Sequence, residues 1–165
     1  MTFEEPLLRR AAELIDLCRA RQLRVAAAES CTGGLVAGLI TSIAGSSDVF
    51  EAGYVTYSNA AKVSMIDVPE TLLAAHGAVS AEVAKAMAEG ALRRSGAALA
   101  IAITGVAGPG GGTPLKPVGL VYLAAVSKSG NIATRQLRLG DPGREAVRLA
   151  AVAEAVAMLY ALAAA

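Results

Sequence analysis

Residues 23–43 read LRVAAAESCTGGLVAGLITSI, and this stretch decides the fold. Residues 23–28 form a short apolar run, which predicts a strand, and residues 35–43 form a longer apolar run, which predicts a helix. Residues 29–34 therefore lie where a strand passes into a helix, with a glycine pair at the opening of the helix. A strand–turn–helix unit of this kind is typical of a layered α/β domain.

The rest of the chain predicts further strands and helices. Apolar and β-branched runs predict strands at 49–57, 99–104, 119–126 and 132–139, the last two as a hairpin. Helical spacing and capping residues predict helices at 7–18, after Ser58, from Ser80 to about Ser95, and from Asp141 to the C-terminus. The resulting order, α-β-α-β-α-α-β-β-β-α, favours one α/β domain over residues 1–165, and the hairpin makes its sheet mixed.

Composition excludes several classes of protein. The 165 residues are 55% hydrophobic and 4% aromatic, so the chain folds around a core rich in small and branched aliphatic side chains. The formal net charge of +1 argues against direct nucleic-acid binding. There is neither a signal-peptide core nor an unbroken apolar membrane span, which favours a cytoplasmic protein. Two Cys and one His supply too few zinc ligands, so we expect neither a metal nor a cofactor.

The first candidate site is the turn at residues 29–34. A small nucleophile, Ser30, follows the strand. The N-terminus of the next helix carries unpaired N–H groups, here those of Thr32, Gly33 and Gly34, which could hold a phosphate or an oxyanion. A simpler interpretation stays open, in which Ser30 or Thr32 caps the helix and the glycines only ease packing.

The second candidate is VTYSNAAK at residues 55–62, in which Tyr57 ends a strand and Lys62 lies on a short helix. A serine nucleophile needs a base, and a lysine base must be partly desolvated so that it is neutral near pH 7. A Ser-His-Asp triad would have to use His76, whose place before a glycine favours the C-terminus of a helix instead. Lys62 is the better candidate, and a solvated surface lysine is the alternative.

The third candidate is the loop TGVAGPGGGT at residues 104–113, directly after a buried strand. Ligands in open α/β sheets bind beyond the C-terminal ends of the strands, and a glycine-rich backbone can cradle a phosphate. The candidate ligand-binding residues are Gly105, Gly108, Gly110 and Gly111. The loop matches neither a P-loop nor a Rossmann fingerprint, and a flexible surface loop is the alternative.

Four motifs in one order resemble the C-terminal domain of the CinA (competence/damage-inducible) family, and they cover nearly the whole chain. They are AESCTGG at 28–34, VTYSNAAK at 55–62, GAVS at 77–80 and ITGVAGPGGGTPLKPVG at 103–119. The resemblance implies a three-layer α/β/α sandwich with a mixed, mostly parallel sheet, and a homo-oligomer. It also implies a nicotinamide-nucleotide amidohydrolase that converts nicotinamide mononucleotide to nicotinate mononucleotide and ammonia in pyridine nucleotide salvage.

The same resemblance assigns roles to individual residues. Ser30 corresponds to the nucleophile, Lys62 to the base, and Tyr57 and Thr104 to supporting hydroxyls. The tail of the family usually reads Gly-Asp-Arg, whereas here Pro and Gly intervene before Arg144, the expected ligand contact. The family often has an N-terminal molybdopterin-binding-like domain that is not in this sequence, so we expect a stand-alone member or a fragment. A catalytically silent nucleotide-binding or regulatory module is the alternative function.

Overall fold

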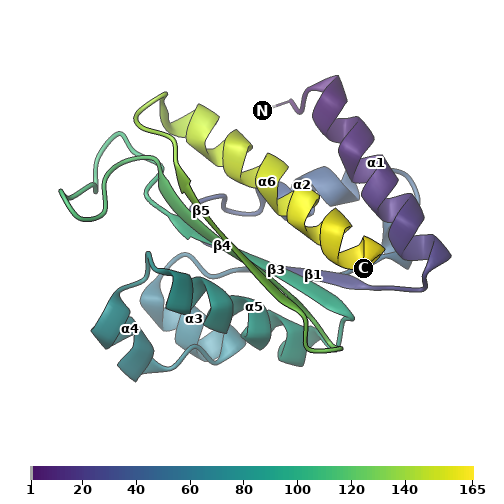
Figure 1. Cartoon of the computed structure of the whole chain (residues 1–165), viewed down its shortest axis with the longest axis horizontal. Coiled ribbons are helices and arrows are strands. Elements are labelled where there is room, and N and C mark those ends of the chain that lie inside the picture. The colour runs from purple at the N-terminus through teal and green to yellow at the C-terminus, as the bar shows by residue number, and fades with distance from the viewer. Residues whose placement is uncertain (1) are drawn as a thin grey trace.

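The computed structural model describes residues 2–165, which form a mixed five-stranded sheet between two layers of helices (Figure 1). The strand order is β2-β1-β3-β4-β5, in which β1 runs parallel to β2 and β3, while β4 and β5 are antiparallel additions. The strands are β1 (Val25–Glu29), β2 (Phe50–Val55), β3 (Leu99–Gly105), β4 (Leu120–Ser127) and β5 (Ile132–Arg138). The predicted α/β sandwich with a mixed sheet is confirmed.

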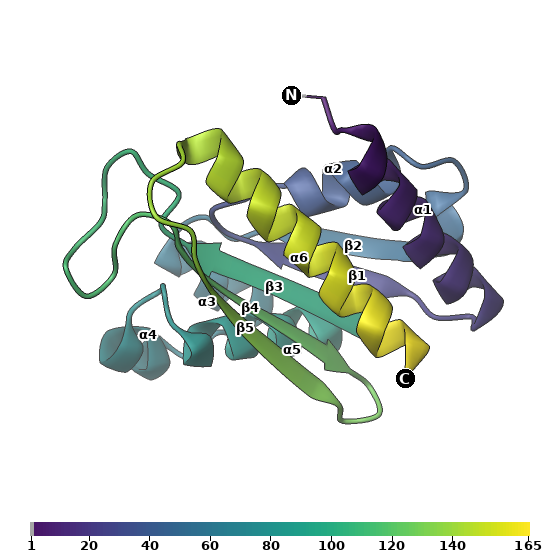
Figure 2. The same ribbon diagram turned by 45° about the horizontal axis from the view of Figure 1, so that its top comes forward.

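The helices divide between the two faces of the sheet (Figures 1 and 2). One face carries α1 (Glu5–Ala20), α2 (Leu35–Thr41) and α6 (Arg144–Ala164), and the other carries α3 (Asn59–Ile66), α4 (Glu70–His76) and α5 (Ala81–Ser95). A short 3₁₀ helix, η1 (Ser46–Asp48), precedes β2. Each face has its own hydrophobic cluster, so the central strands β1 and β3 are buried on both sides.

Helix α6 belongs to the core. Its length and composition alone would suit a membrane span. Its apolar positions recur at helical spacing, however, and they pack on the sheet and on α1. The buried residues of α6 are Val147, Ala151, Val152, Ala155, Val156, Met158, Leu159 and Ala163. The interpretation of the Ala-rich C-terminal run as a packed helix therefore agrees with its burial.

Small side chains let α5 lie close to the sheet. The strand residues that face it are mainly alanines, namely Ala26, Ala28, Ala100, Ala102 and Ala124. Helix α5 itself has Gly90 where it crosses the end of α3, and a Cβ on Gly90 would lie 1.8 Å from the carbonyl oxygen of Ile66. The α3–α5 contact therefore requires glycine at this position.

We expect Gly90→Ala to lower the free energy of unfolding by about 1–3 kcal/mol, because the added methyl group forces α3 and α5 apart. This overrides the roughly 1 kcal/mol by which Ala favours a helix over Gly. Gly38→Ala on α2 is the matched control, since nothing lies within 4 Å of its Cβ position. That variant should gain about 0.5–1 kcal/mol. Urea denaturation measures both, and a Gly90→Ala protein as stable as Gly38→Ala would contradict the contact.

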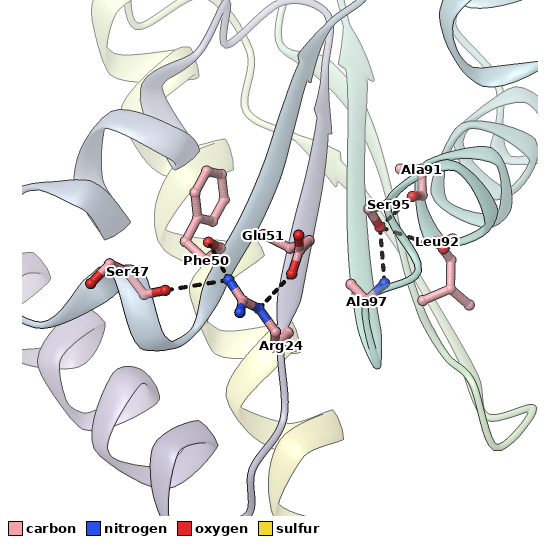
Figure 3. A network of polar contacts seen from close by, with 8 residues as sticks. All are labelled: Arg24, Ser47, Phe50, Glu51, Ala91, Leu92, Ser95 and Ala97. Atoms are coloured by element: carbon pink, nitrogen blue, oxygen red, sulfur yellow. Dashed lines mark hydrogen bonds and ion pairs between the residues drawn. The ribbon is translucent and has the colours of Figure 1, made fainter.

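Polar contacts fix the end of the sheet where β1 begins (Figure 3). The Arg24 guanidinium pairs with Glu51 and donates to the carbonyl oxygens of Ser47 and Phe50, which ties the start of β1 to that of β2. Ser95 donates to the carbonyl of Ala91 at the end of α5 and accepts from the N–H of Ala97.

Several element boundaries differ from the sequence-based prediction, and two of the differences have a clear cause in the backbone. Three helices, not two, connect β2 to β3, because Asp67 takes a left-handed conformation and Pro69 follows it. Helix α4 buries only Leu73, so it lacks the apolar periodicity that would predict it. The last helix begins at Arg144 instead of Asp141, because Gly143 has a φ of +96°.

Candidate active site

The carboxyl ends of three parallel strands meet at one edge of the sheet. The register pairs Glu29 of β1 with Val55 of β2 and with Ile103 of β3. The residues that follow these positions are therefore neighbours, although they are far apart in the sequence. The glycine-rich loop after β3 and the start of α6 lie at the same end of the molecule (Figure 2). This is the edge where α/β sheets bind ligands.

Ser30 and Lys62 are in direct contact at this edge. Lys62 Nζ lies 3.1 Å from Ser30 Oγ and donates a 2.7 Å hydrogen bond to the carbonyl oxygen of Thr56. Ser30 is held by its own N–H, which donates to the carbonyl of Ile103. The side chain of Ser58 caps α3 by accepting from the N–H of Ala61, and this fixes the helix that carries Lys62.

Lys62 is buried, which rules out a solvated surface lysine. Only 1% of the residue is exposed, and no carboxylate within residues 2–165 forms an ion pair with it. Burial lowers the pKa of Lys62, because the ammonium group loses its hydration, and the smaller opposing effect of the nearby Cys31 does not reverse this. A lysine that gives up its proton easily, beside a serine hydroxyl, has the arrangement of a general base and its nucleophile.

Cys31 is the competing nucleophile next in the chain. It is buried, and burial, with a smaller contribution from the Glu29 carboxylate, raises the pKa of its thiol to about 11. The reactive form of cysteine is the thiolate, which this pKa suppresses at neutral pH. The local environment therefore favours Ser30 over Cys31.

An open pocket of about 300 Å³ lies over Ser30. This volume is at the lower end of the range for small-molecule sites. The pocket brings together Ser30, Cys31, Tyr57, Arg144 and the four glycines proposed from the sequence, Gly105, Gly108, Gly110 and Gly111. Arg144 is its only charged lining residue among those that the structure describes, so the pocket suits an anionic ligand.

Arg144 and Tyr57 form one side of the pocket together. Arg144 Nη2 donates to the Tyr57 hydroxyl at 3.1 Å, and Nη1 donates to the carbonyl oxygen of Gly108 at 2.8 Å. The guanidinium group thus connects the segment that follows β2, the glycine-rich loop and α6. The two extra residues before Arg144 do not move it away from the site.

The Thr104 hydroxyl and the His76 imidazole form no hydrogen bond with Ser30 within residues 2–165. Thr104 is buried, and its hydroxyl donates to the carbonyl of Ala78 at 2.8 Å, so its proton is already used to hold the segment between α4 and α5. His76 ends α4 on the surface, 3.5 Å from Glu82. Within residues 2–165, no three His, Cys, Asp or Glu side chains gather closely enough to hold a metal ion.

The N-terminus of α2 does not provide the anion site expected from the sequence. The carboxylate of Glu29 accepts hydrogen bonds from the N–H groups of Gly34, Val36 and Ala37 at 2.9–3.1 Å. The N–H of Gly33 donates to the carbonyl of Ser30. Thr32, Gly33 and Gly34 also do not line the pocket. The expected binding role of Gly33 and Gly34 is therefore corrected, because both N–H groups are already bound and the Glu29 carboxylate occupies the positive end of α2. The expected role of Thr32 is corrected because Thr32 does not line the pocket, and neither Ser30 nor Thr32 caps α2.

Two residues that the sequence reasoning missed shape this turn. Glu29 is buried at the end of β1, and Arg148 of α6 donates to the carbonyl oxygens of Cys31 at 3.1 Å and Thr32 at 2.8 Å. Each had a signal in the sequence. Glu29 is an acidic residue in an apolar strand, and Arg148 follows Arg144 by four positions on one helix face.

Comparisons with known proteins agree with this architecture. The family model described as CinA C-terminal domain matches residues 8–163. A CinA-like protein of Anaeromyxobacter dehalogenans (strain 2CP-C) is 56% identical over 151 residues, which cover 89% of this chain and 36% of that protein. The chain spans about a third of the length of the curated relatives it matches.

Solved structures show the same fold over nearly the full chain. The competence/damage inducible protein CihA from Agrobacterium tumefaciens superposes with a TM-score of 0.96 at 49% identity, covering 98% of both chains. A CinA superfamily protein from Klebsiella pneumoniae gives 0.90 at 36% identity, covering 96% of this chain and 98% of that one. The match of the family model and these similarities show that the chain belongs to the CinA C-terminal domain family.

Proposed function

We propose that this domain hydrolyses the carboxamide of nicotinamide mononucleotide to nicotinate mononucleotide and ammonia. The observation that carries the proposal is the 3.1 Å contact between the buried Lys62 Nζ and the Oγ of Ser30, a residue that lines the pocket. The choice of substrate follows the resemblance to the CinA family, and the charge of the pocket supports it.

The proposed reaction has two halves. Neutral Lys62 takes the proton of Ser30 while Oγ attacks the carboxamide carbon, and the protonated lysine then gives that proton to the departing nitrogen, which leaves as ammonia. An acyl-serine ester remains. Lys62 next takes a proton from water, the hydroxide attacks the ester carbon, and Ser30 leaves with the proton returned by Lys62. The carbonyl oxygen of Thr56 keeps Nζ directed at Ser30 throughout.

The phosphate of the substrate would bind to Arg144 and the glycine-rich loop. Arg144 lies at the pocket with no carboxylate partner among the residues described, and its guanidinium is oriented by Tyr57 and Gly108. The N–H groups of Gly110 and Gly111 donate to no acceptor within residues 2–165. Such backbone donors, together with one arginine, suit a phosphate monoester.

The direct test is ammonia release from nicotinamide mononucleotide by the purified chain, with the nicotinate mononucleotide product identified by chromatography. Stoichiometric release supports the proposal. Tight binding of the mononucleotide without any release would contradict it and would favour the catalytically silent binding module instead.

We expect kcat/KM for nicotinamide mononucleotide to exceed that for nicotinamide riboside by at least about 100-fold, from two charge-assisted hydrogen bonds of roughly 1.5–3 kcal/mol each. The reactive amide is the same in both, so only the remote phosphate distinguishes them. Arg144→Met should reduce the preference to about tenfold or less while leaving the riboside rate near its wild-type value. Equal rates for the two substrates in the wild-type chain would show that this pocket does not recognise phosphate.

A further inference from the structure

The turn after Ser30 has an unusual balance of donors and acceptors. The N–H of Cys31 meets only the thiol of its own residue, which is a weak acceptor, and the N–H of Thr32 donates to no acceptor within residues 2–165. The N–H groups of Ser30, Gly33 and Gly34 all donate to oxygen atoms. Buried N–H groups without partners are rare in folded proteins. Cys31 lines the pocket and Thr32 lies fully buried behind it, so the first donor without an oxygen acceptor is directly beside the nucleophile.

The carbonyl groups of the same turn are bound from the opposite side. Arg148 donates from Nε to the Cys31 oxygen and from Nη2 to the Thr32 oxygen. The bond to the Cys31 oxygen fixes the peptide that carries the Thr32 N–H. The peptide that carries the Cys31 N–H is fixed by its own carbonyl, that of Ser30, which accepts from the N–H of Gly33. Arg148 therefore holds the Cys31 residue from its carbonyl side. A hydrogen bond to the carbonyl of a peptide also polarises its N–H, so Arg148 strengthens the donor of Thr32.

The Glu29 carboxylate holds the other end of the turn. Its hydrogen bonds to Gly34, Val36 and Ala37 fix where α2 begins, and its backbone carbonyl accepts from the N–H of Thr56, whose own carbonyl holds Lys62. Glu29 forms no ion pair among the residues described and does not line the pocket. Glu29 therefore contacts both elements: its side chain holds the turn, and its backbone carbonyl binds the residue that orients the base.

We propose that the N–H of Cys31 receives the oxyanion that forms on the amide oxygen, and that Glu29 and Arg148 are positioning residues that hold this donor turn. The inference rests on the proposed nucleophile Ser30. In acyl transfer the charge on the carbonyl oxygen develops only as the nucleophile attacks, so a fixed donor beside the nucleophile stabilises the transition state more than the substrate. The N–H that follows a nucleophilic serine has this role in other hydrolases.

The experiment uses Arg148→Met and Arg148→Lys, with Arg21→Met as the matched control. Arg21 also donates to a backbone carbonyl, that of Ala163, but far from the pocket. Arg148→Met should lower kcat on the order of 100-fold, as loss of one oxyanion donor does, and leave KM within about twofold. Arg148→Lys should recover part of the lost kcat, and Arg21→Met should retain the wild-type kcat. Glu29→Gln tests the other positioning residue, and it too should lower kcat and leave KM nearly unchanged.

A boronic acid separates this inference from the choice of substrate. Pyridine-3-boronic acid forms a tetrahedral adduct on a serine, with one oxygen at the oxyanion position, whereas nicotinate mononucleotide binds without one. The affinity for pyridine-3-boronic acid should fall in Arg148→Met by the same factor as kcat, while the affinity for nicotinate mononucleotide stays unchanged. Parallel losses for both ligands, or no loss for the boronate, would overturn the inference. A wild-type chain that binds the boronate through Ser30 but releases no ammonia would contradict only the proposed substrate.

Discussion

Ser30→Ala is expected to reduce ammonia release from nicotinamide mononucleotide by at least about 10³-fold, because removal of a covalent nucleophile leaves only binding and oxyanion stabilisation. The variant keeps the hydrogen bond from its N–H to Ile103, and Lys62 keeps its bond to the Thr56 carbonyl. The pocket should therefore still bind the mononucleotide, which calorimetry measures independently of turnover. Turnover close to the wild-type value would exclude Ser30 as the nucleophile.

Two further alanine variants make the result specific. Ser64 is exposed on the same helix as Lys62, so Ser64→Ala should behave as the wild-type chain does. Cys31→Ala retains the peptide N–H and removes a thiol that its raised pKa keeps protonated, so we expect a loss of no more than about tenfold. If Cys31 were the nucleophile instead, the outcomes for Ser30 and Cys31 would exchange.

The strand–turn–helix unit could be predicted because its signals are local. An apolar run of strand length followed by ESCTGG and a second apolar run requires no knowledge of distant contacts. The parallel sheet then follows from the alternation of strands and helices, and it gathers the ends of β1, β2 and β3 at one edge. That topology is enough to predict that Ser30, Tyr57 and the glycine-rich loop lie near one another.

The role of Glu29 could not be predicted, because it depends on backbone geometry within the turn. Its carboxylate reaches three N–H groups only because Gly33 and Gly34 both take positive φ, at 60° and 96°. Hydrophobic periodicity identifies where a helix begins, but it does not show which group offsets the partial positive charge at the helix N-terminus. The sequence therefore predicted an anion site where the protein has placed an anion of its own.

Arg144 and Arg148 illustrate the limit for contacts between distant segments. Arg144 reaches Tyr57, which is 87 residues away, and Arg148 reaches Cys31, which is 117 residues away. Helical spacing puts both arginines on one face of α6, but only the packing of α6 across β3 shows that this face meets the turn after β1. For the same reason Thr104 could be placed at the correct strand end while its hydroxyl bonds to Ala78.

Lys62→Met is expected to lower kcat by about 10²–10⁴-fold, the usual contribution of a general base, and to leave the protein folded. Two effects on stability oppose each other. Removing a buried ammonium group relieves its desolvation, and the Thr56 carbonyl loses its donor. We therefore expect a thermal midpoint within about 5 °C of wild type. Lys85→Met on α5, where the lysine is exposed and paired with Glu89, is the matched control and should retain full activity.

The pH dependence of the wild-type chain tests the role of Lys62 as a base. Only the neutral amine can accept the proton of Ser30, so kcat should rise with pH and level off above the pKa of Lys62. Burial lowers this pKa, so the rise in kcat should come below the value of about 10.4 for a solvated lysine.

The free energy of unfolding should also increase with pH. Between the folded and unfolded pKa values the unfolded chain binds more protons at Lys62, so the contribution of this residue to the free energy of unfolding increases as pH rises through that window and is smallest below it. In Lys62→Met both the rise in kcat and this contribution should disappear, and Lys85→Met should keep both. A kcat that is flat from acid to alkaline pH in the wild-type chain, measured in single turnovers so that chemistry limits the rate, would exclude Lys62 as the base.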